Sequence, residues 1–421
     1  MTNVTASPDL EGLRTALPPD VQRAPEAYVL DGVTPALAVR PRSMSELAAT
    51  LLAADQGGLA VAPQGGRTAL TLGRPLARYD VALDTTALDQ VIEYAPADLT
   101  ITVEAGMTLA ALQATLGAEG QYLPVDPAPG DQVTIGGLLA TARSGAWRGH
   151  LPAARDLVLG ATVAMPDGAT VTSGGRVVKN VSGYDMHRMH TGALGGLGVI
   201  VAASFKLAPV PAERATLILD CGSLASAGAT AQALWDRNLA ARAITILDPE
   251  AAAAIGLRPS SSVLAEFAGD DVVVARSLSE AGAVARDHGS LAELIDDDPW
   301  TRLRRLASGE TEATVVRAGV PASEVAALVG RASAMMGPAW GHIAAGAVWA
   351  RPAADATALA ALRAAATEAG GYLQLESAPR SLREGVDSFG EIDGQLMNAL
   401  KTQFDPNNTL NPGKWAAEAT S

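Results

Sequence analysis

Four clusters of glycine dominate this sequence and restrict what it can fold into. They lie at 64–68 (QGGRT), 134–149 (TIGGLLATARSGAWRG), 174–207 and 410–414 (LNPGK). Glycine loses more backbone entropy on folding than any other residue, so repeated pairs need a compensating role, and the close approach of backbone N–H groups to a bound anion is one. A single Gly-Gly pair is usually an ordinary turn. Four clusters, each beside a short apolar strand, together indicate a ligand held against bare backbone.

The glycine spacing does not fit the common nucleotide-binding fingerprints. A Rossmann G-x-G-x-x-G follows a strand and opens a helix. Residues 192–198 read G-x-x-G-G-x-G, with a predicted helix before them at 184–190 and an apolar strand after them at 199–207. No Walker A lysine follows 64–68. We therefore expect the ligand to lie in a different fold.

Length and composition exclude several classes of protein. A chain of 421 residues is too long for one ordinary core, so two or three domains are expected. Its 45 acidic and 31 basic residues give a net charge of −14, which repels phosphate backbones, and nucleic acid is not an expected partner. Cys221 is the only cysteine, so no intrachain disulfide, cysteine-ligated zinc or iron–sulfur cluster is expected, as in a reducing cytosol.

The N-terminal twenty residues lack the basic start and apolar core of a signal peptide, and no segment offers about 18 uncharged apolar residues. We therefore expect a cytoplasmic protein without direct membrane insertion, peripheral to the inner face of the membrane only through partner subunits.

Two sequence patterns divide the chain near residue 210. Before it, a short buried strand is expected at 59–63, another short strand at 81–84 and a half-buried strand at 98–106. After it, alternating strands and Ala-rich helices continue to about residue 379, which is typical of helices packed on one face of an antiparallel sheet. The turn-rich tail 404–415 contains Phe404, Leu410 and Trp415, apolar residues that predict it is tied down.

Read in order, the motifs resemble those of the FAD-binding oxidase family of the vanillyl-alcohol oxidase type, whose flavin domain is called the PCMH-type FAD-binding domain. The resemblance covers about 35–210 and resumes near 375–415. It rests on P-x-x-G-x-x-x-x-x-x-G from Pro63, T-I-G-G-x-x-A-T, G-x-L-G-x-x-G-V-I and L-N-P-G-K. Within the family, VVKNVSGYDMHRMHTGALGGLGVI (177–200) is most similar to the FAD-binding subunits of glycolate oxidases.

The resemblance implies an α+β fold, with a two-subdomain PCMH-type FAD-binding domain plus an α+β cap domain with an antiparallel sheet. The implied divisions are an N-terminal lead (1–34), the FAD-binding domain (35–210), the cap or substrate domain (211–375) and a C-terminal segment that returns to the FAD domain (376–421).

The resemblance also implies which residues bind FAD. The pyrophosphate loop would be Pro63, Gln64, Gly65, Gly66, Arg67, Thr68, Ala69 and Leu70. The diphosphate and the edge of the flavin ring would be lined by Pro127, Thr134, Ile135, Gly136, Gly137, Thr141, Ser144 and Gly145. Gly192, Gly195, Gly198, Val199 and Ile200 would lie beside the ribityl chain and ring, and Asn411 would close the site.

Two departures from the family pattern matter. Members that bind FAD covalently carry a His or Cys in the pyrophosphate loop or near the second motif. The segments QGGRTALTLG and TIGGLLATARSG contain neither residue, so noncovalent FAD is implied. Arg143 stands where many relatives have alanine or glycine.

The substrate site is marked less clearly. Oxidation of a 2-hydroxy acid by flavin needs a base for the hydroxyl proton and a cation for the carboxylate. Catalytic relatives carry a His-rich motif on a cap strand, and the matching stretch 340–350 (WGHIAAGAVWA) retains His342 without a second histidine or an acidic partner. The catalytic residue is therefore unassigned, with His342 as a weak candidate, because a lone histidine on an apolar strand is more often structural.

Other charged residues are interpreted as structural. His187 and His190 lie three apart on a predicted helix, but no third ligand is apparent, so no metal site is expected. Arg380 and Arg383 are interpreted as a solvated basic pair at a sheet edge.

The implied activity is that of an FAD-dependent oxidoreductase acting on CH–OH groups. The leading hypothesis is the FAD-binding subunit of a glycolate oxidase (2-hydroxy-acid dehydrogenase) complex that converts glycolate to glyoxylate, with a second flavin-containing dehydrogenase subunit and an iron–sulfur subunit as partners. Two alternatives stay open. One is a stand-alone FAD-linked oxidase or dehydrogenase of another 2-hydroxy acid or alcohol, and the other is a noncatalytic assembly subunit with a structural flavin.

Overall fold

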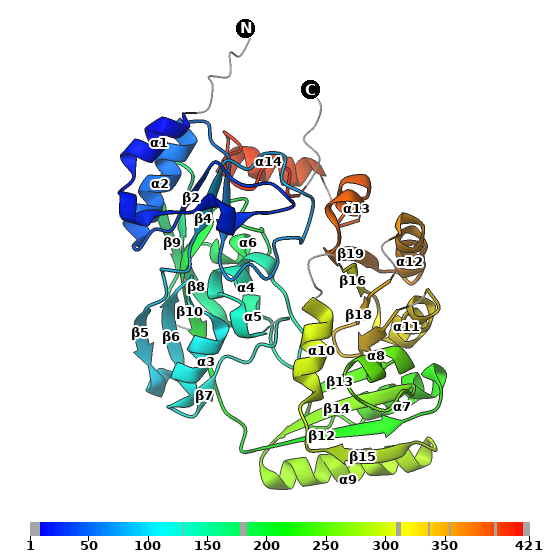
Figure 1. The fold of residues 1–421 in the computed structure, drawn as a ribbon. Helices are drawn as coiled ribbons and strands as arrows, with labels where there is room; N and C mark the ends of the chain where they lie inside the picture. Colours follow the sequence, from blue (N-terminus) through cyan, green and yellow to red (C-terminus); the bar gives the residue numbers. More distant parts are fainter. Residues whose placement is uncertain are drawn as a thin grey trace.

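The computed structural model in Figure 1 describes residues 9–128, 130–176, 183–308, 313–335, 337–352, 355–390 and 394–415. Residues 177–182 of the third glycine-rich stretch lie outside the described residues, as do parts of the N-terminal lead (1–8) and of the C-terminal segment (391–393 and 416–421). The predicted α+β class is confirmed, because helices pack on antiparallel and mixed sheets throughout.

Two sheets form the first half of the chain, coloured blue to green in Figure 1. The four-stranded sheet has the order β1 (Gln22–Arg23), β2 (Leu37–Val39), β4 (Val81–Asp84), β3 (Val61–Gln64), and β2, β4 and β3 are parallel. The five-stranded antiparallel sheet has the order β5 (Val91–Ala95), β6 (Thr100–Glu104), β10 (Val199–Lys206), β8 (Val158–Ala164), β9 (Thr170–Gly174). A short ladder joins β7 (Gln121–Tyr122) to β11 (Ala208–Pro209).

Strand β10 lies between two hydrophobic cores, which explains its unbroken apolar sequence. Val199 and Val201 join the core around α1 (Leu10–Ala16) and α2 (Met44–Gln56). Ile200 and Phe205 join the core around α3 (Leu109–Gly117), α4 (Ile135–Thr141) and α5 (Ala154–Leu157). A strand covered on both faces carries continuous rather than alternating apolar residues. The helix expected at 184–190 is shorter, since α6 covers only His187–His190.

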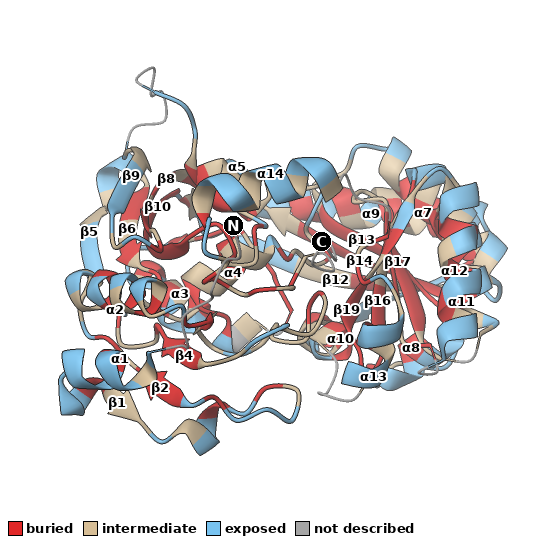
Figure 2. Cartoon of the chain, turned by 90° about the horizontal axis from the view of Figure 1, so that it is seen from above, coloured by how far each residue is buried: buried red, intermediate tan, exposed pale blue. Residues whose placement is uncertain are grey.

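An eight-stranded antiparallel sheet forms the second half. Its order is β15 (Leu291–Ile295), β12 (Glu213–Asp220), β14 (Ser262–Gly269), β13 (Ala241–Leu247), β17 (Ala339–His342), β18 (Ala347–Ala350), β16 (Val315–Gly319), β19 (Tyr372–Ser377). The helices on its outer face are α7 (Leu224–Asp236), α9 (Asp271–Asp287), α11 (Val325–Ser333) and α12 (Ala356–Glu368). Figure 2 shows buried strands of this sheet beneath helices whose outer surfaces are exposed.

The inner face of this sheet is turned toward the first half of the chain. Ala128 and Ala146 pack there with Trp340 and Trp349, together with residues of α8 (Pro249–Ala254) and α10 (Pro299–Ser308). Helices were expected on one face of this sheet, and the structure shows that its other face is covered as well.

After α13 (Arg380–Gly385) and α14 (Gly394–Phe404), the tail packs against the first sheet. The N–H of Val61 donates to Thr409 O at 2.7 Å, and the N–H of Asn411 donates to Val61 O at 2.9 Å. Leu410 is fully buried in the core beside β3. The tail thus extends the edge of the sheet from which the first glycine loop emerges. Over the described residues, no helix is both long and apolar enough to cross a membrane.

Candidate cofactor-binding site

A cavity of about 890 Å³, its open mouth included, lies where β3, α4, β10 and the tail converge. The predicted cofactor-binding residues that line it are Pro63, Gln64, Gly65, Gly66, Arg67, Thr68, Ala69, Leu70, Thr134, Gly136, Gly137, Thr141, Gly195, Gly198, Val199, Ile200 and Asn411. All four glycine motifs therefore contribute to one cavity.

Five predicted residues do not line this cavity. Pro127 faces a larger cleft beside α3, and Ser144 and Gly145 face a smaller cavity under the eight-stranded sheet. Ile135 is buried in the core, and Gly192 is engaged in a turn.

The lining also includes residues that sequence reasoning missed, namely Leu30, Ala62, Leu76, Thr85, Ala140, Leu194 and Lys414. Lys414 belongs to the L-N-P-G-K motif, so its position beside Asn411 was a usable signal. Leu30 and Leu76 lie outside every motif, and nothing in the sequence marks them.

The loop after β3 presents unpaired backbone donors. The N–H groups of Gly65, Gly66, Arg67 and Thr68 donate no hydrogen bond to another described residue, and three of these four residues are partly buried. Buried backbone N–H groups are almost always paired with protein, water or a ligand. The loop therefore fits an anionic group with several acceptor oxygens.

The glycines at 65 and 66 are also required by packing. A β-carbon on Gly65 would lie 2.1 Å from Thr134 Oγ1, and one on Gly66 would lie 1.7 Å from the carbonyl oxygen of Gln132. These contacts are far shorter than real Cβ contacts. The pair is thus explained by close contact between two loops as well as by access to a ligand.

The first turn of α4 has no amides left for a ligand. The N–H of Ile135 donates to Met107 O at 2.9 Å, that of Gly136 to Ala105 O at 2.7 Å, and that of Gly137 to the capping hydroxyl of Thr134 at 3.2 Å. This part of the predicted site contributes bare surface rather than hydrogen-bond donors.

The turn before β10 is fixed by α4 and by the tail. The N–H groups of Gly192 and Leu194 donate to Leu139 O and Ala140 O, each at 2.8 Å. The side-chain amide of Asn411 donates to Leu194 O at 2.8 Å. Asn411 therefore joins the tail to this turn, and both residues of this hydrogen bond line the cavity.

The side chain of Arg67 points away from the cavity. Its guanidinium donates to Val29 O at 2.8 Å and to Ala27 O, and it lies 5.6 Å from the ring centre of Tyr28. Arg67, at a φ of 59°, thus ties the N-terminal lead to the loop. Only its backbone remains available to a ligand.

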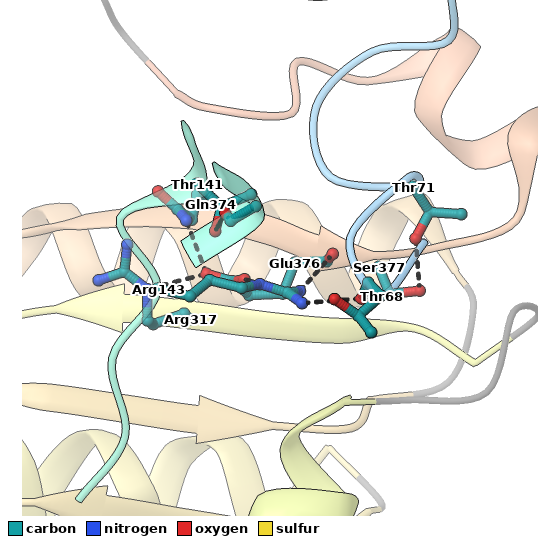
Figure 3. Close-up of polar contacts among 9 residues, drawn as sticks. Thr68, Thr71, Thr141, Arg143, Arg317, Gln374, Glu376 and Ser377 are labelled. Carbon is teal, nitrogen blue, oxygen red and sulfur yellow. Dashed lines mark hydrogen bonds and ion pairs between the residues drawn. The ribbon is translucent and has the colours of Figure 1, made fainter. Parts of the chain in front are cut away.

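Arg143 connects the loop to the eight-stranded sheet, as Figure 3 shows. Its Nε donates to Glu376 Oε2 at 2.8 Å, and its two terminal nitrogens donate to Glu376 O and Thr68 O, each at 3.1 Å. On the other side of the carboxylate, Arg317 Nε and Gln374 Nε2 donate to Glu376 Oε1 at 2.9 and 2.6 Å. One buried carboxylate therefore binds two guanidinium groups from different halves of the chain.

These charges control the ionisation of Glu376. Burial alone would raise the pKa of this carboxyl, but the positive charges of Arg143 and Arg317 and the hydrogen bonds from Arg317 and Gln374 lower it to about 2. Glu376 is therefore ionised at neutral pH, and its carboxylate forms ion pairs with both Arg143 and Arg317.

His342 lies in the smaller cavity, which has a volume of about 320 Å³. Its Nδ1 is 2.9 Å from Thr245 Oγ1, and the nearby indoles of Trp340 and Trp349 are stacked with centres 6.3 Å apart. Burial and the neighbouring His150 lower the pKa of His342 to about 3, so the imidazole is neutral. His342 does not line the cavity formed by the four glycine motifs where β3, α4, β10 and the tail converge, which we call the glycine-walled cavity.

His187 and His190 are buried rather than solvent-exposed. His187 Nδ1 lies 3.4 Å from Ser173 Oγ, and His190 packs edge-on against Phe404. Across the ranges that the structure describes, no group of three or more His, Cys, Asp or Glu side chains is arranged to hold a metal ion.

The interpretation of Arg383 as a solvated residue was wrong. Its side chain is fully buried, forms an ion pair with Asp31, and donates to Ala378 O at 2.9 Å. The loop at Gly73 and the N-terminal lead cover it, a long-range contact that local sequence cannot reveal. Arg380 is exposed and pairs with Glu384 at 2.6 Å, as expected for a surface residue.

Comparison with protein families agrees with this geometry. Residues 35–174 match the family described as FAD binding domain, and residues 383–415 match the family described as FAD linked oxidases, C-terminal domain. The two matches contain the first loop, α4 and the tail.

Curated relatives cover different shares of the chain. Glycolate oxidase subunit GlcD of Bacillus subtilis is 26% identical over 91% of this chain and 89% of its own length. D-lactate dehydrogenase of Anaerostipes hadrus is 25% identical over 92% of this chain and 91% of its own. Glycolate oxidase subunit GlcE of Escherichia coli is 37% identical, over 37% of this chain and 44% of its own.

Solved structures share the fold at low sequence identity. p-Cresol methylhydroxylase with substrate bound superposes with a TM-score of 0.73 at 14% identity, covering 98% of this chain and 96% of that one. 4-Ethylphenol oxidase from Gulosibacter chungangensis gives a TM-score of 0.74 at 15% identity, covering 96% of both chains.

The packing of the glycine pair predicts the effect of one methyl group. Gly66→Ala should displace residues 132–134, lower the free energy of unfolding by about 1–3 kcal/mol and reduce the bound FAD per chain. Gly117→Ala is the matched control, because a β-carbon there meets no atom within 4 Å. Thermal unfolding and the flavin absorbance of the purified proteins measure both effects. Unchanged stability and flavin content in Gly66→Ala would contradict this account.

The Arg143–Glu376–Arg317 network predicts a pH-dependent contribution to stability. Glu376→Gln should lower the free energy of unfolding at pH 7 by about 3–5 kcal/mol, because the buried Arg143 and the partly buried Arg317 lose their carboxylate. The folded pKa of about 2 is below the ordinary 4.5, so the contribution is present above about pH 4.5 and is lost as the pH falls toward 2.

Urea unfolding between pH 7 and 3.5 should therefore show the difference between wild type and Glu376→Gln narrowing below pH 4.5. Glu384→Gln, which removes an exposed carboxylate from Arg380, should change stability by less than about 1 kcal/mol. A difference for Glu376→Gln that stays constant over this pH range would refute the role given to the network.

Proposed function

Since the chain is an FAD-linked oxidoreductase with a PCMH-type FAD-binding fold, we propose that it is the FAD-binding subunit of a glycolate oxidase complex, a 2-hydroxy-acid dehydrogenase that oxidises glycolate to glyoxylate. Its relatives are FAD-linked 2-hydroxy-acid dehydrogenases, named for glycolate, D-lactate and D-2-hydroxyglutarate. The observation that carries the finer proposal is the 37% identity to the GlcE subunit, the highest value among these relatives.

The hydrogen-bond donors and charges that line the cavity suit FAD. The lining includes the unpaired amides of the 65–68 loop and the side chain of Lys414, and it contains no Asp or Glu. A diphosphate carries negative charge and several acceptor oxygens, and bare backbone lets it approach. We therefore assign the 65–68 loop to the diphosphate, and the turn at 195–200 to the rest of the cofactor. Because no His or Cys lines the cavity, the FAD is noncovalent.

When bound, FAD accepts a hydride from a substrate carbon. The chain's own residues position the cofactor: the packing of Gly65 against Thr134 and the hydrogen bond from Asn411 to Leu194 hold the two walls of the cavity together. Arg143 holds the loop to the eight-stranded sheet.

The candidate catalytic bases of the chain favour a role as a subunit over a role as a self-sufficient dehydrogenase. His342 lies in the smaller cavity, bonded to Thr245, and the carboxylate of Glu376 is held by two arginines, so neither is placed to act as a base beside a flavin in the glycine-walled cavity. We propose that a second flavin-containing dehydrogenase subunit supplies the substrate site. An iron–sulfur subunit would carry electrons onward, since this chain has one cysteine. The complex would be cytoplasmic or peripheral to the membrane.

The proposal includes the divisions of the chain. Residues 35–210 together with 376–421 would form the FAD-binding domain, and 211–375 the cap. The break at 210–211 precedes β12, the first strand of the eight-stranded sheet.

One observation favours a second candidate, a stand-alone dehydrogenase. The match to D-lactate dehydrogenase spans 92% of this chain, whereas the match to the GlcE subunit spans 37%. Under this alternative the isolated chain would oxidise a 2-hydroxy acid by itself.

Anaerobic reduction of the purified protein separates the candidates. The subunit proposal predicts FAD absorbance that dithionite bleaches but glycolate, D-lactate and D-2-hydroxyglutarate leave unchanged. It also predicts glycolate turnover after copurification with a second flavoprotein and an iron–sulfur protein from the native cell. Rapid bleaching of the isolated chain by one of these acids would establish the stand-alone alternative. A copurified complex that keeps full activity when Gly66→Ala removes FAD from this chain would assign it a noncatalytic assembly role.

A further inference from the structure

The cavity contains a buried cation with no anionic partner in the protein. The side chain of Lys414 is 8% exposed, and its ammonium donates to Leu70 O at 2.6 Å. Among the described residues it meets no other acceptor and no carboxylate within ion-pair distance. An ammonium has three N–H donors, so two of them are left for a ligand.

The neighbouring charges do not neutralise Lys414. The negative charge of Asp31 acts on Lys414, but Asp31 is paired with Arg383, whose positive charge acts on Lys414 as well. The guanidinium of Arg67 already donates hydrogen bonds to backbone carbonyls of the N-terminal lead. Tyr79 is bonded to Gln64, and burial raises its pKa to about 12, so it is neutral. The cavity thus has an uncompensated positive charge.

Burying an unpaired ammonium is costly, and such a group tends to lose its proton. Burial, reinforced by Arg383 and opposed by Asp31, lowers the pKa of Lys414 to about 7. Because Lys414 reaches Leu70, immediately beyond the unpaired amides of the 65–68 loop, an anion bound by those amides would also be near the ammonium.

We propose that Lys414 binds the diphosphate of FAD as an ammonium and that cofactor binding therefore takes up a proton and weakens at alkaline pH. This inference rests on the proposed placement of FAD in the glycine-walled cavity. It adds a specific residue, held by the tail, that distinguishes FAD from an uncharged flavin.

The direction of the pH dependence follows from linkage. Without FAD, Lys414 loses its proton above about pH 7. A bound diphosphate favours the ammonium and raises the pKa in the complex. Affinity is therefore constant below about pH 7 and falls by up to about tenfold per pH unit above it, until the pH reaches the raised pKa of the complex.

Titration of deflavinated wild-type protein with FAD tests this between pH 6.5 and 9. The dissociation constant should rise about 10-fold or more over this interval. Calorimetry at pH 8 in two buffers of different ionisation enthalpy should show uptake of nearly one proton per FAD. A dissociation constant that is flat from pH 7 to 9, without proton uptake, would overturn the proposal.

Three variants separate charge from structure. Lys414→Met should bind FAD about 10- to 100-fold more weakly at pH 6.5 and lose the pH dependence. Lys414→Arg should also lose the pH dependence but bind more tightly than Lys414→Met, which keeps the test valid if the methionine variant is unstable. Lys206→Met, a charge-loss control at an exposed position, should behave as wild type.

Retention of the wild-type pH dependence in Lys414→Met or Lys414→Arg would overturn the proposal. If wild-type protein binds no FAD at any pH, the placement of FAD fails instead, so the two failures can be told apart.

Discussion

A half-buried backbone loop with unpaired N–H groups is the constraint on which this structure depends. The amides of the 65–68 loop have no acceptor within the loop, and neighbouring residues contact other backbone atoms of the loop and of Leu70, which follows it. Thr134 packs on Gly65, Arg143 donates to Thr68 O and Lys414 donates to Leu70 O. Each contact fixes the loop without consuming an amide, so the donors remain directed at a ligand that the chain itself does not provide.

The same contacts couple distant parts of the chain. Arg143 and Glu376 connect the loop to β19 of the eight-stranded sheet, and Asn411 connects β3 to the turn before β10. A bound cofactor would therefore stabilise both halves together. The network also removes Glu376 from acid–base chemistry, because its carboxylate is already bound by two arginines.

The sequence was informative where local chemistry decides structure. Glycine clusters and strand β10 predicted the walls of the cavity because apolar runs and bare backbone are local signals. Ser144 and Gly145 face a different cavity because α4 ends at Thr141 and Ala142 adopts a left-handed φ of 50°, a change of direction that the glycine pattern does not reveal. Contacts between residues far apart in the sequence, such as Arg383 with Asp31 and Lys414 with Leu70, could not be predicted, because no local sequence pattern indicates which residues meet.

The binding of the cofactor by the amides of residues 65–68 is our proposal, and amide hydrogen exchange of the protein with and without FAD measures it. A peptide covering 65–68 should exchange markedly more slowly when FAD is bound, and one covering 195–198 should do so as well. Unchanged exchange at 65–68, with protection concentrated elsewhere in the chain, would contradict it.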